Sequence, residues 1–365
     1  MSKAADLANL IGNINAGGGG VNRNVVINGS MNVAQRATSS TGLGSSNGYF
    51  TCDRWRLAFN TSGRITSAQD GSDTPDTNGF ANCLKLSTTT ADTSIASGEY
   101  LFLQQKFEGQ HLQAFAKGTS TAKPFALSFY VKGNASATYV AELYDGDNSR
   151  QVSKAFNVTT SWNRVELSIP ADTTGSFDDD NATSLNLSIW LHAGSDYTSG
   201  TLNETWGSVT AANRVVGISS ILDSTSRTFS ITGVQLEVGQ NPTTFEHEPF
   251  ERTLEKCQRY YYLAMDSASD GDTHGPIGAN YSSSNARLVF FFPKLMRATP
   301  TLTSSGTFRI YSRSQNDTIS DLSLKVGHNK FAQVNTDSIS ATGGDACFTY
   351  TNTSNAAKIQ FDSEL

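Results

Sequence analysis

The residues from Phe229 to Tyr262 constrain the fold most, because the period of the hydrophobic residues changes within them. Up to Gly239, apolar and polar residues alternate as they do in a half-buried strand. The segment 240–242 ends this strand, since Pro242 lacks a hydrogen-bond donor and disfavours helix in the residue before it. Beyond Pro249 the apolar residues have helical spacing, so the sequence predicts that a strand closes one unit and a helix opens the next. The helical positions are Phe250, Leu254, Cys257 and Tyr261.

The composition favours a folded, strand-rich protein. The length of 365 residues is enough for about two domains. Only 16% of the residues are charged, and Ser, Thr, Asn and Gly supply most of the polarity, which suits short strands joined by turns. The net charge of −6 and the lack of a Lys/Arg cluster argue against nucleic-acid binding. The sequence contains no apolar run of about 18 residues, so no membrane insertion is expected.

Residues 1–20 are predicted to be an attachment segment. Residues 4–14 form a short amphipathic helix, and the four glycines of 17–20 then make a flexible tether. A helix shorter than about 12–15 residues is marginal alone, so another surface must cover its apolar stripe. The tether favours attachment to sister chains or to a larger assembly over packing on the helix's own domain. The predicted attachment residues are Leu7, Leu10, Ile11 and Ile14.

Residues 21–240 are predicted to form a large β-sandwich. Short strands recur between Gly, Asn and Asp turns, and their apolar residues share one face, as Leu127, Phe129 and Val131 do. Within this class we favour a jelly roll, which resembles carbohydrate-binding modules of the galactose-binding type. After an initial strand at 25–27, the predicted strands are 81–86, 100–107, 124–132, 137–144, 150–158, 163–169, 184–192, 215–222 and 229–238.

Residues 241–365 are predicted to form a smaller β-sandwich with one helix. The helix covers Arg252–Tyr262 and precedes a polar loop and a strongly apolar strand at 288–292. Further strands are expected at 307–312, 322–326, 330–334, 346–350 and 358–362.

Several short sequence elements are similar to those of bacteriophage tail-fibre and minor structural proteins. Near the start, the segment 24–36 (NVVINGSMNVAQR) is followed by the triplet Asp53-Arg54-Trp55; in the centre, GVQLEVG at 233–239 is followed by EKCQRYY at 255–261. The segment FPKLMRATPT at 292–301 and the terminal FDSEL are also similar. From the residues alone, Trp55 is expected to anchor the core, and Asp53 and Arg54 to hold a loop.

The resemblance implies a virion appendage protein that is assembled in the host cytoplasm. A homotrimer would be held, or bound to other virion proteins, through the N-terminus, and a β-domain would contact host-surface glycan. Two alternatives remain open: a capsid-decorating head fibre, and a carbohydrate-active enzyme or its binding module.

The residue pattern predicts no enzyme. The chain has no HExxH or GxSxG motif, and an extended segment would send His247 and its neighbours Glu246 and Glu248 to alternate faces. The acidic groups at 145–147, 178–180 and 270–272 are interpreted as solvated turns, and no cofactor is expected. A structural calcium ion at Asp178–Asp180 is the one exception left open.

Sugar binding would require exposed aromatic rings with hydrogen-bonding groups around them. Tyr197 and Trp206 lie in predicted loops and are the candidate stacking residues, although they could instead cap the sandwich end or line a subunit contact. The four cysteines form no CxxC pair and are expected to be free thiols of a reducing cytoplasm. They are Cys52, Cys83, Cys257 and Cys347.

Overall fold

The computed structural model describes residues 3–15, 22–267, 274–313, 315–351 and 357–365. The chain forms two compact units, residues 1–253 with Leu365, and residues 254–364. Strands dominate both units, so the prediction of a mainly β protein is confirmed. Among the described residues, no helix has the length and apolar character needed to cross a bilayer.

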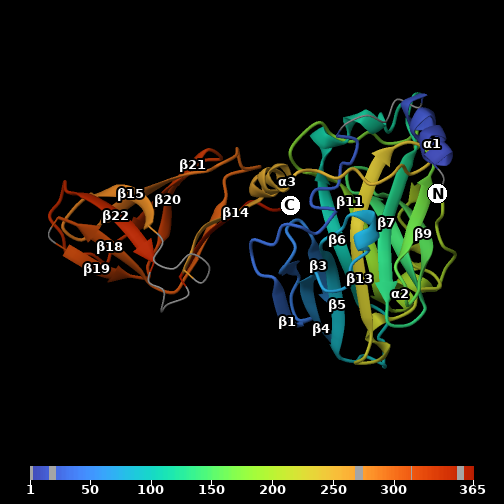
Figure 1. The fold of residues 1–365 in the computed structure, drawn as a ribbon, viewed down its shortest axis with the longest axis horizontal. Helices are drawn as coiled ribbons and strands as arrows, with labels where there is room; N and C mark the ends of the chain where they lie inside the picture. The colour runs from blue at the N-terminus through green and yellow to red at the C-terminus, as the bar shows by residue number, and fades with distance from the viewer. Residues whose placement is uncertain (1–2, 16–21, 268–273, 314, 352–356) are drawn as a thin grey trace. The chain divides into compact units, whose positions relative to one another are not determined.

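The larger unit is a sandwich of two antiparallel sheets (Figure 1). The first sheet contains, in spatial order, β1 (Ser39–Leu43), β4 (Arg64–Asp70), β5 (Cys83–Thr90), β13 (Thr228–Val238), β7 (Phe125–Gly133) and β10 (Asn163–Ile169). The second sheet contains β12 (Gly207–Ser208), β9 (Arg150–Val158), β8 (Ala137–Asp145), β11 (Thr183–Ala193), β6 (Tyr100–Glu108), β3 (Arg56–Asn60) and β2 (Gly48–Tyr49). Because the chain passes repeatedly from one sheet to the other, the predicted sandwich of jelly-roll type is confirmed.

Alternation along the strands builds the core between these sheets. In β7, Phe125, Leu127, Phe129 and Val131 are fully buried, as their shared face predicts. The inward residues of β11 meet them from the second sheet. Apolar side chains therefore fill the interior, and the intervening side chains of each strand face outward.

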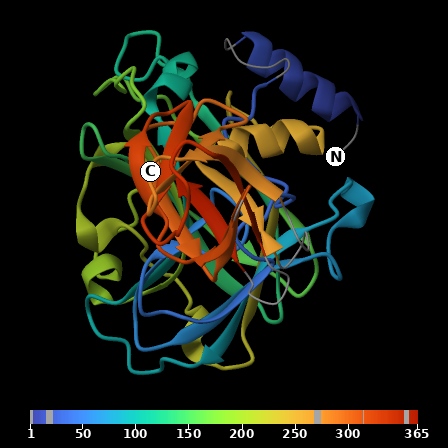
Figure 2. The ribbon, with the colours of Figure 1, turned by 90° about the vertical axis from the view of Figure 1, so that its left-hand side faces the viewer.

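Short helices complete the larger unit. The 3-10 helices are η1 (Asp76–Asn78), η2 (Gly109–His111), η3 (Gln113–Phe115), η4 (Ala211–Asn213) and η5 (Ile221–Asp223), and α2 covers Ser195–Thr198. The helix α1 (Lys3–Asn15) lies at the periphery of this unit, as Figures 1 and 2 show.

The residues that carried the phage resemblance at the start of the chain contact one another. Trp55 is buried and its indole N–H donates to the carbonyl of Asn28 at 3.0 Å. The Asn28 side chain donates to the carbonyls of Val33 at 2.8 Å and Asp53 at 3.0 Å. Asp53 accepts from the backbone N–H of Gln35 at 3.0 Å. Trp55 and Asp53 therefore anchor this segment as predicted.

Two predicted strands are absent. Residues 25–27 form no ladder, because the Asn24 side chain takes the hydrogen bonds of β13: it donates to Val234 O at 3.1 Å and accepts from Leu236 N–H at 3.1 Å. Residues 215–222 also form no strand. Val215 instead packs against the outward face of the second sheet, and Ile221 begins η5.

The centre of the chain confirms the change from strand to helix. Here β13 is followed by the irregular segment 239–249, which we call the tie, and by α3 (Phe250–Gln258). The prediction placed the end of this helix at Tyr262. The helix ends earlier, at Gln258, because Tyr261 and Tyr262 already belong to β14. Cys257 lies on the buried face of α3, and the other three cysteines are also buried.

The smaller unit contains two antiparallel sheets around their own core. The third sheet contains β14 (Tyr261–Asp266), β23 (Lys358–Asp362) and β17 (Thr301–Ser305). The fourth contains β19 (Gln315–Ile319), β18 (Phe308–Ser312), β22 (Ala346–Thr351), β15 (His274–Asn280), β16 (Ala286–Phe291), β21 (Phe331–Thr336) and β20 (Ser323–Gly327). Side chains of both sheets share one core, in which Phe361 lies 5.2 Å from Phe290.

The core of the larger unit can be tested at Phe129, whose ring lies 5.0 Å from that of Phe156. Phe129→Ala should lower the free energy of unfolding by about 3–5 kcal/mol, because a fully buried ring leaves a cavity. The matched control is Phe250→Ala, where the ring is 51% exposed and the loss should be small. Urea denaturation of both variants measures the difference, and equal losses would contradict the described core.

Candidate functional site

The most site-like surface of the larger unit lies on the outward face of the first sheet. Alternation along β7 turns Ser128, Tyr130 and Lys132 outward, and the antiparallel register places Arg164 of β10 opposite Tyr130. A hollow of about 520 Å³ lies over this face. We call it the Tyr130 hollow. Its lining residues are Asp6, Asn78, Tyr130, Arg164, Glu166 and Thr244.

The Tyr130 hollow combines a half-buried ring with polar and charged groups. Arg164 donates to Glu166 at 2.5 Å, and its other terminal nitrogen donates to the Thr243 carbonyl. Burial raises the pKa of Tyr130, with smaller opposing and reinforcing effects from Arg164 and Glu166, so its hydroxyl remains a hydrogen-bond donor at neutral pH. The hollow can therefore offer a ring face, N–H and O–H donors, and carboxylate acceptors to one ligand.

A second half-buried ring extends this surface beside Lys132. The indole N–H of Trp162 donates to Asp73 at 3.1 Å, and Lys132 donates to the same carboxylate at 2.7 Å. The hydrogen bond from Lys132 lowers the pKa of Asp73, and the one from Trp162 adds to this effect. The outward face of β7 and β10 thus alternates aromatic and charged groups.

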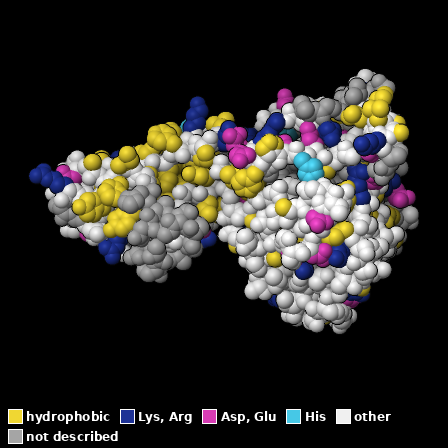
Figure 3. Space-filling view, viewed as in Figure 1, with side chains coloured by type: hydrophobic (Ala, Val, Ile, Leu, Met, Phe, Trp, Pro, Cys, Tyr) yellow, Lys and Arg dark blue, Asp and Glu magenta, His cyan; other side chains and the backbone are white. Residues whose placement is uncertain are grey.

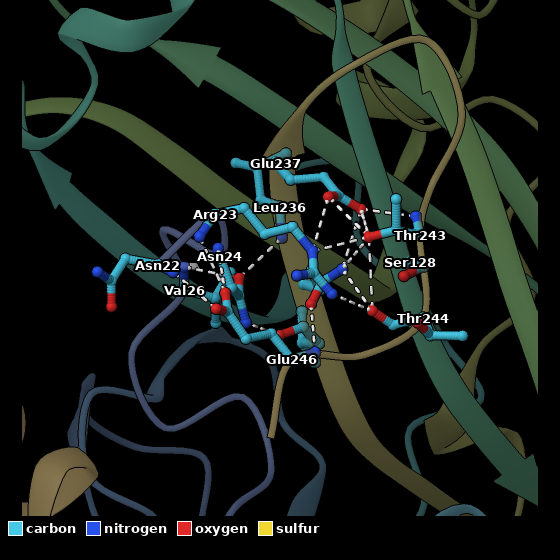
Figure 4. A network of polar contacts seen from close by, with 12 residues as sticks. Asn22, Arg23, Asn24, Val26, Ser128, Leu236, Glu237, Thr243, Thr244 and Glu246 are labelled. Atoms are coloured by element: carbon cyan, nitrogen blue, oxygen red, sulfur yellow. Dashed lines mark hydrogen bonds and ion pairs between the residues drawn. The ribbon is translucent and has the colours of Figure 1, made fainter. Parts of the chain in front are cut away.

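The tie holds the edge of the Tyr130 hollow in place (Figure 4). Buried Glu237 accepts from the Thr243 backbone N–H at 2.7 Å and pairs with Arg23 at 3.3 Å. Glu246 accepts from the consecutive backbone N–H groups of residues 22, 23 and 24 at 2.6, 2.9 and 3.2 Å. These carboxylates fasten the N-terminal segment and the tie to β13, which positions Thr244 at the hollow.

His247 takes part in packing within the tie. Its ring lies 4.9 Å from both Phe80 and Phe245, while the neighbouring Glu246 binds backbone N–H groups. The His247 side chain also lies within hydrogen-bond distance of the Asn78 carbonyl, with Nε2 at 3.1 Å from the oxygen.

The candidate residues Tyr197 and Trp206 belong to two different clusters. Tyr197, on α2, is half-buried and lies 5.4 Å from the ring of Trp190 on the outward face of the second sheet. Trp206 packs 5.6 Å from Phe125 at the main core, and its indole N–H donates to the Pro170 carbonyl at 3.0 Å. The structure therefore does not bring the two rings together into one binding surface.

Lys117 forms a buried ion pair with Asp145, the first residue of the acidic group at 145–147. Its buried ammonium donates to Asp145 at 2.5 Å, lies 3.1 Å from Asp172, and donates to the carbonyls of Thr174 at 3.0 Å and Gly175 at 2.8 Å. Burial raises the pKa of Asp172, but hydrogen bonds from Arg150, Thr174 and Lys117 outweigh this effect and leave it below its usual value. The interpretation of Asp145 as part of a solvated turn is therefore wrong. Its carboxylate is buried, and the ammonium of Lys117 neutralises it.

The acidic run at 178–180 stabilises loops. Asp147 accepts from the backbone N–H of Asp178 at 3.0 Å, and Asp180 accepts from that of Ala182 at 2.8 Å. In the described part of the chain, the ligand atoms of Asp178–Asp180 do not converge into a group of three.

The helix α1, which the sequence predicts to be an attachment segment, leaves part of its apolar stripe exposed. Leu7 is 57% exposed and Ile11 is 50% exposed, whereas Leu10 is half-buried. The side chain of Ile14 and the glycine tether lie outside the described residues. Asp6, on the same helix, reaches the Tyr130 hollow.

The smaller unit carries an exposed apolar groove of about 640 Å³. Ile277 and Phe291 line it and are 74% and 76% exposed. Hydrophobic side chains are also prominent over this unit in Figure 3. No charged residue is among those that line the groove.

Comparison with known proteins finds distant structural similarity. No protein-family model and no curated protein sequence matches the chain. A carbohydrate-binding module, CBM4, is similar with a TM-score of 0.31 and 10% identity over 58% of this chain and 97% of that chain. The family 11 module from Clostridium thermocellum, in complex with a β-1,3-1,4-mixed-linked tetrasaccharide, has a TM-score of 0.28 and 12% identity over 58% of this chain and 99% of that chain.

A bacteriophage structure is similar to the same extent. The enzymatically active domain of tailspike protein 4 from bacteriophage CBA120 has a TM-score of 0.29 and 12% identity, over 59% of this chain and 21% of that chain.

The buried Lys117 cluster gives a direct prediction. Lys117→Met should lower the free energy of unfolding by about 3–5 kcal/mol, because it leaves two buried carboxylates without their shared cation. Lys154→Met, at a half-buried lysine on β9, is the matched control and should have a small effect. Urea denaturation at pH 7 compares them, and a stable Lys117→Met protein would show that the ammonium is dispensable.

Proposed function

We propose that this chain is a non-enzymatic bacteriophage virion protein of the tail-fibre or appendage kind, and that its larger unit binds host-surface glycan at the Tyr130 hollow. The observation that carries the proposal is the composition of this hollow: a half-buried tyrosine ring lies among Arg164, Glu166 and Asn78 on the outward face of a sheet. The phage-like motifs of the sequence support the virion assignment.

The Tyr130 hollow has the chemistry that a sugar needs. A pyranose ring presents an apolar C–H face, which packs on an aromatic ring, and a rim of hydroxyl groups that both donate and accept. Tyr130 supplies the ring, while Arg164 and Glu166 supply a donor and an acceptor one strand away. Trp162 offers a second ring along the same face, where a further sugar unit of a chain could pack.

The attachment role rests on α1. A soluble chain gains free energy by covering neighbouring apolar side chains, and Leu7 and Ile11 are both at least half exposed. We propose that sister copies of this chain cover the stripe in a homotrimer, which docks through α1 onto other virion proteins. The apolar groove at Phe291 would contact a sister copy as well, since its lining offers a sugar no charged partner.

The non-enzymatic part of the proposal is supported by the use of the buried carboxylates. Glu142 forms two 2.7 Å hydrogen bonds with Arg214 and also accepts from Trp190 at 2.9 Å. Glu237 pairs with Arg23 and accepts a hydrogen bond from the Thr243 backbone N–H. Incubation with host polysaccharide should release no fragments, and released oligosaccharides would favour the alternative of a carbohydrate-active enzyme.

Tyr130→Ala should weaken glycan binding about tenfold, because removal of a stacking ring costs about 1 kcal/mol or more in addition to its buried area. Tyr144→Ala is the matched control, since Tyr144 is a half-buried tyrosine on the outward face of the second sheet. A host-glycan array followed by titration measures both, with Tyr197→Ala and Trp206→Ala in the same series. If Tyr130→Ala binds glycan as the wild type does while Tyr197→Ala or Trp206→Ala loses binding, the Tyr130 hollow is not the binding site and the site lies at Tyr197 or Trp206.

The assembly role predicts that Leu7→Asp combined with Ile11→Asp converts the trimer to a monomer, because two charges would enter the apolar contact. Light scattering coupled to size-exclusion chromatography measures the mass. Ala8→Asp adds a charge to the same helix outside the stripe and should leave the trimer intact. A wild-type protein that is strictly monomeric would contradict the assembly role.

The position on the virion needs a separate experiment. Antibody labelling of virions would distinguish a tail appendage from a head fibre.

A further inference from the structure

Three ligand-type side chains converge at one end of the larger unit, away from the Tyr130 hollow in the fold. His192 lies near the end of β11, Glu99 immediately precedes β6, and Asp92 follows β5. Their carboxylate oxygens and imidazole nitrogen all lie within 4.8 Å of one another. His192 is fully buried, Asp92 is 4% exposed and Glu99 is half-buried.

The imidazole of His192 is held at one nitrogen and left open at the other. Nδ1 lies 2.8 Å from the hydroxyl oxygen of Ser220, which also accepts from the Leu222 backbone N–H at 3.0 Å. The Ser220 oxygen has a second lone pair that can accept from an Nδ1–H group, and in that tautomer the lone pair of the imidazole is on Nε2. Nε2 is buried without a hydrogen-bond partner and faces the Glu99 carboxylate at 3.7 Å.

The two carboxylates are held by short contacts to neighbouring loops. One oxygen of Asp92 accepts from the Thr61 hydroxyl at 2.7 Å and from the Ser62 backbone N–H at 3.1 Å. One oxygen of Glu99 accepts from the Ala96 backbone N–H at 2.9 Å. These bonds position the carboxylates without supplying a positive charge. Among the described residues, His192 is the only side chain able to carry a positive charge that contacts either carboxylate.

Two carboxylates thus meet one imidazole at a largely buried location. Their negative charge is costly there unless a cation is present.

We propose that His192, Asp92 and Glu99 bind a divalent transition-metal ion, with Zn²⁺ as the best fit. An imidazole nitrogen with two carboxylate oxygens is a ligand set for Zn²⁺ or Mn²⁺, whereas Ca²⁺ takes oxygen ligands alone. The Ser220 contact supplies the outer hydrogen bond that orients a metal-bound histidine. The ion would join β11, the loop before β6 and the loop after β5 at this end of the sandwich.

The test uses the full-length protein, freed of metal with a chelator and then titrated with Zn²⁺ alone by calorimetry. We expect one bound Zn²⁺ per chain, a rise in the thermal unfolding midpoint on binding, and weaker binding of Ca²⁺. His192→Gln and Glu99→Gln should each weaken the Zn²⁺ affinity at least tenfold. The matched controls, His328→Gln and Glu204→Gln, change exposed residues elsewhere and should retain the affinity.

Metal binding can also be measured on the wild-type protein alone, without any variant. Co²⁺ added to the metal-free protein should give an absorption spectrum of a nitrogen- and oxygen-bound ion, and Zn²⁺ should displace it. The absence of Zn²⁺ binding by the wild type would overturn the proposal and leave a histidine–carboxylate cluster without metal. Equal Zn²⁺ affinity in a folded His192→Gln protein, or tighter binding of Ca²⁺ than of Zn²⁺, would also overturn it.

Discussion

The packing of two apolar sheet faces against each other is the constraint on which the larger unit depends. Strands such as β7 and β11 bury every second side chain between the sheets, and the remaining side chains must face outward. The same alternation that buries Phe129 therefore sets Tyr130 on the outer surface. The core and the candidate binding surface both result from the two-residue alternation of side chains along a strand. A shift of the strand register by one residue would move the core side chains outward and the surface side chains inward.

Side-chain hydrogen bonds, more than strand ladders, hold residues 22–36 in place. Asn24, Asn28 and Glu246 supply bonds that a regular strand would make through its backbone. This explains why the motif-like residues of the phage resemblance are buried and polar at the same time. It also links residues far apart in the sequence, so that the tie and the N-terminal segment hold the edge of the Tyr130 hollow together.

The strands with clear alternation and strong turn signals could be predicted from the sequence, often to within two residues, as at 150–158 and 163–169. The segment 215–222 could not, because Val215 packs on an outer face while Ile221 enters the main core, and the backbone pairs with no neighbouring strand. The alternation along 124–132 predicts that the Tyr130 side chain faces outward. The sequence does not predict that Arg164 and Asn78 lie beside its ring, because these residues come from other parts of the chain.

The metal ligands and the partner of Asp145 were beyond prediction for a related reason. His192, Asp92 and Glu99 have no characteristic spacing and meet only because β5 and β11 end where β6 begins, on the same side of the sandwich. Likewise, nothing in the acidic pattern around Asp145 indicates that Lys117 approaches from another loop. Sequence periodicity locates faces of strands, while such clusters arise from the topology that brings strand ends together.

The ammonium of Lys117 has a consequence for the surroundings in which the protein can work. A bound ion stabilises a fold only in proportion to its supply, and it leaves when the medium is depleted. A cation carried on the chain can be neither diluted nor chelated, so the loops around Asp145 and Asp172 keep their arrangement in ion-poor water as well as in mineral-rich water.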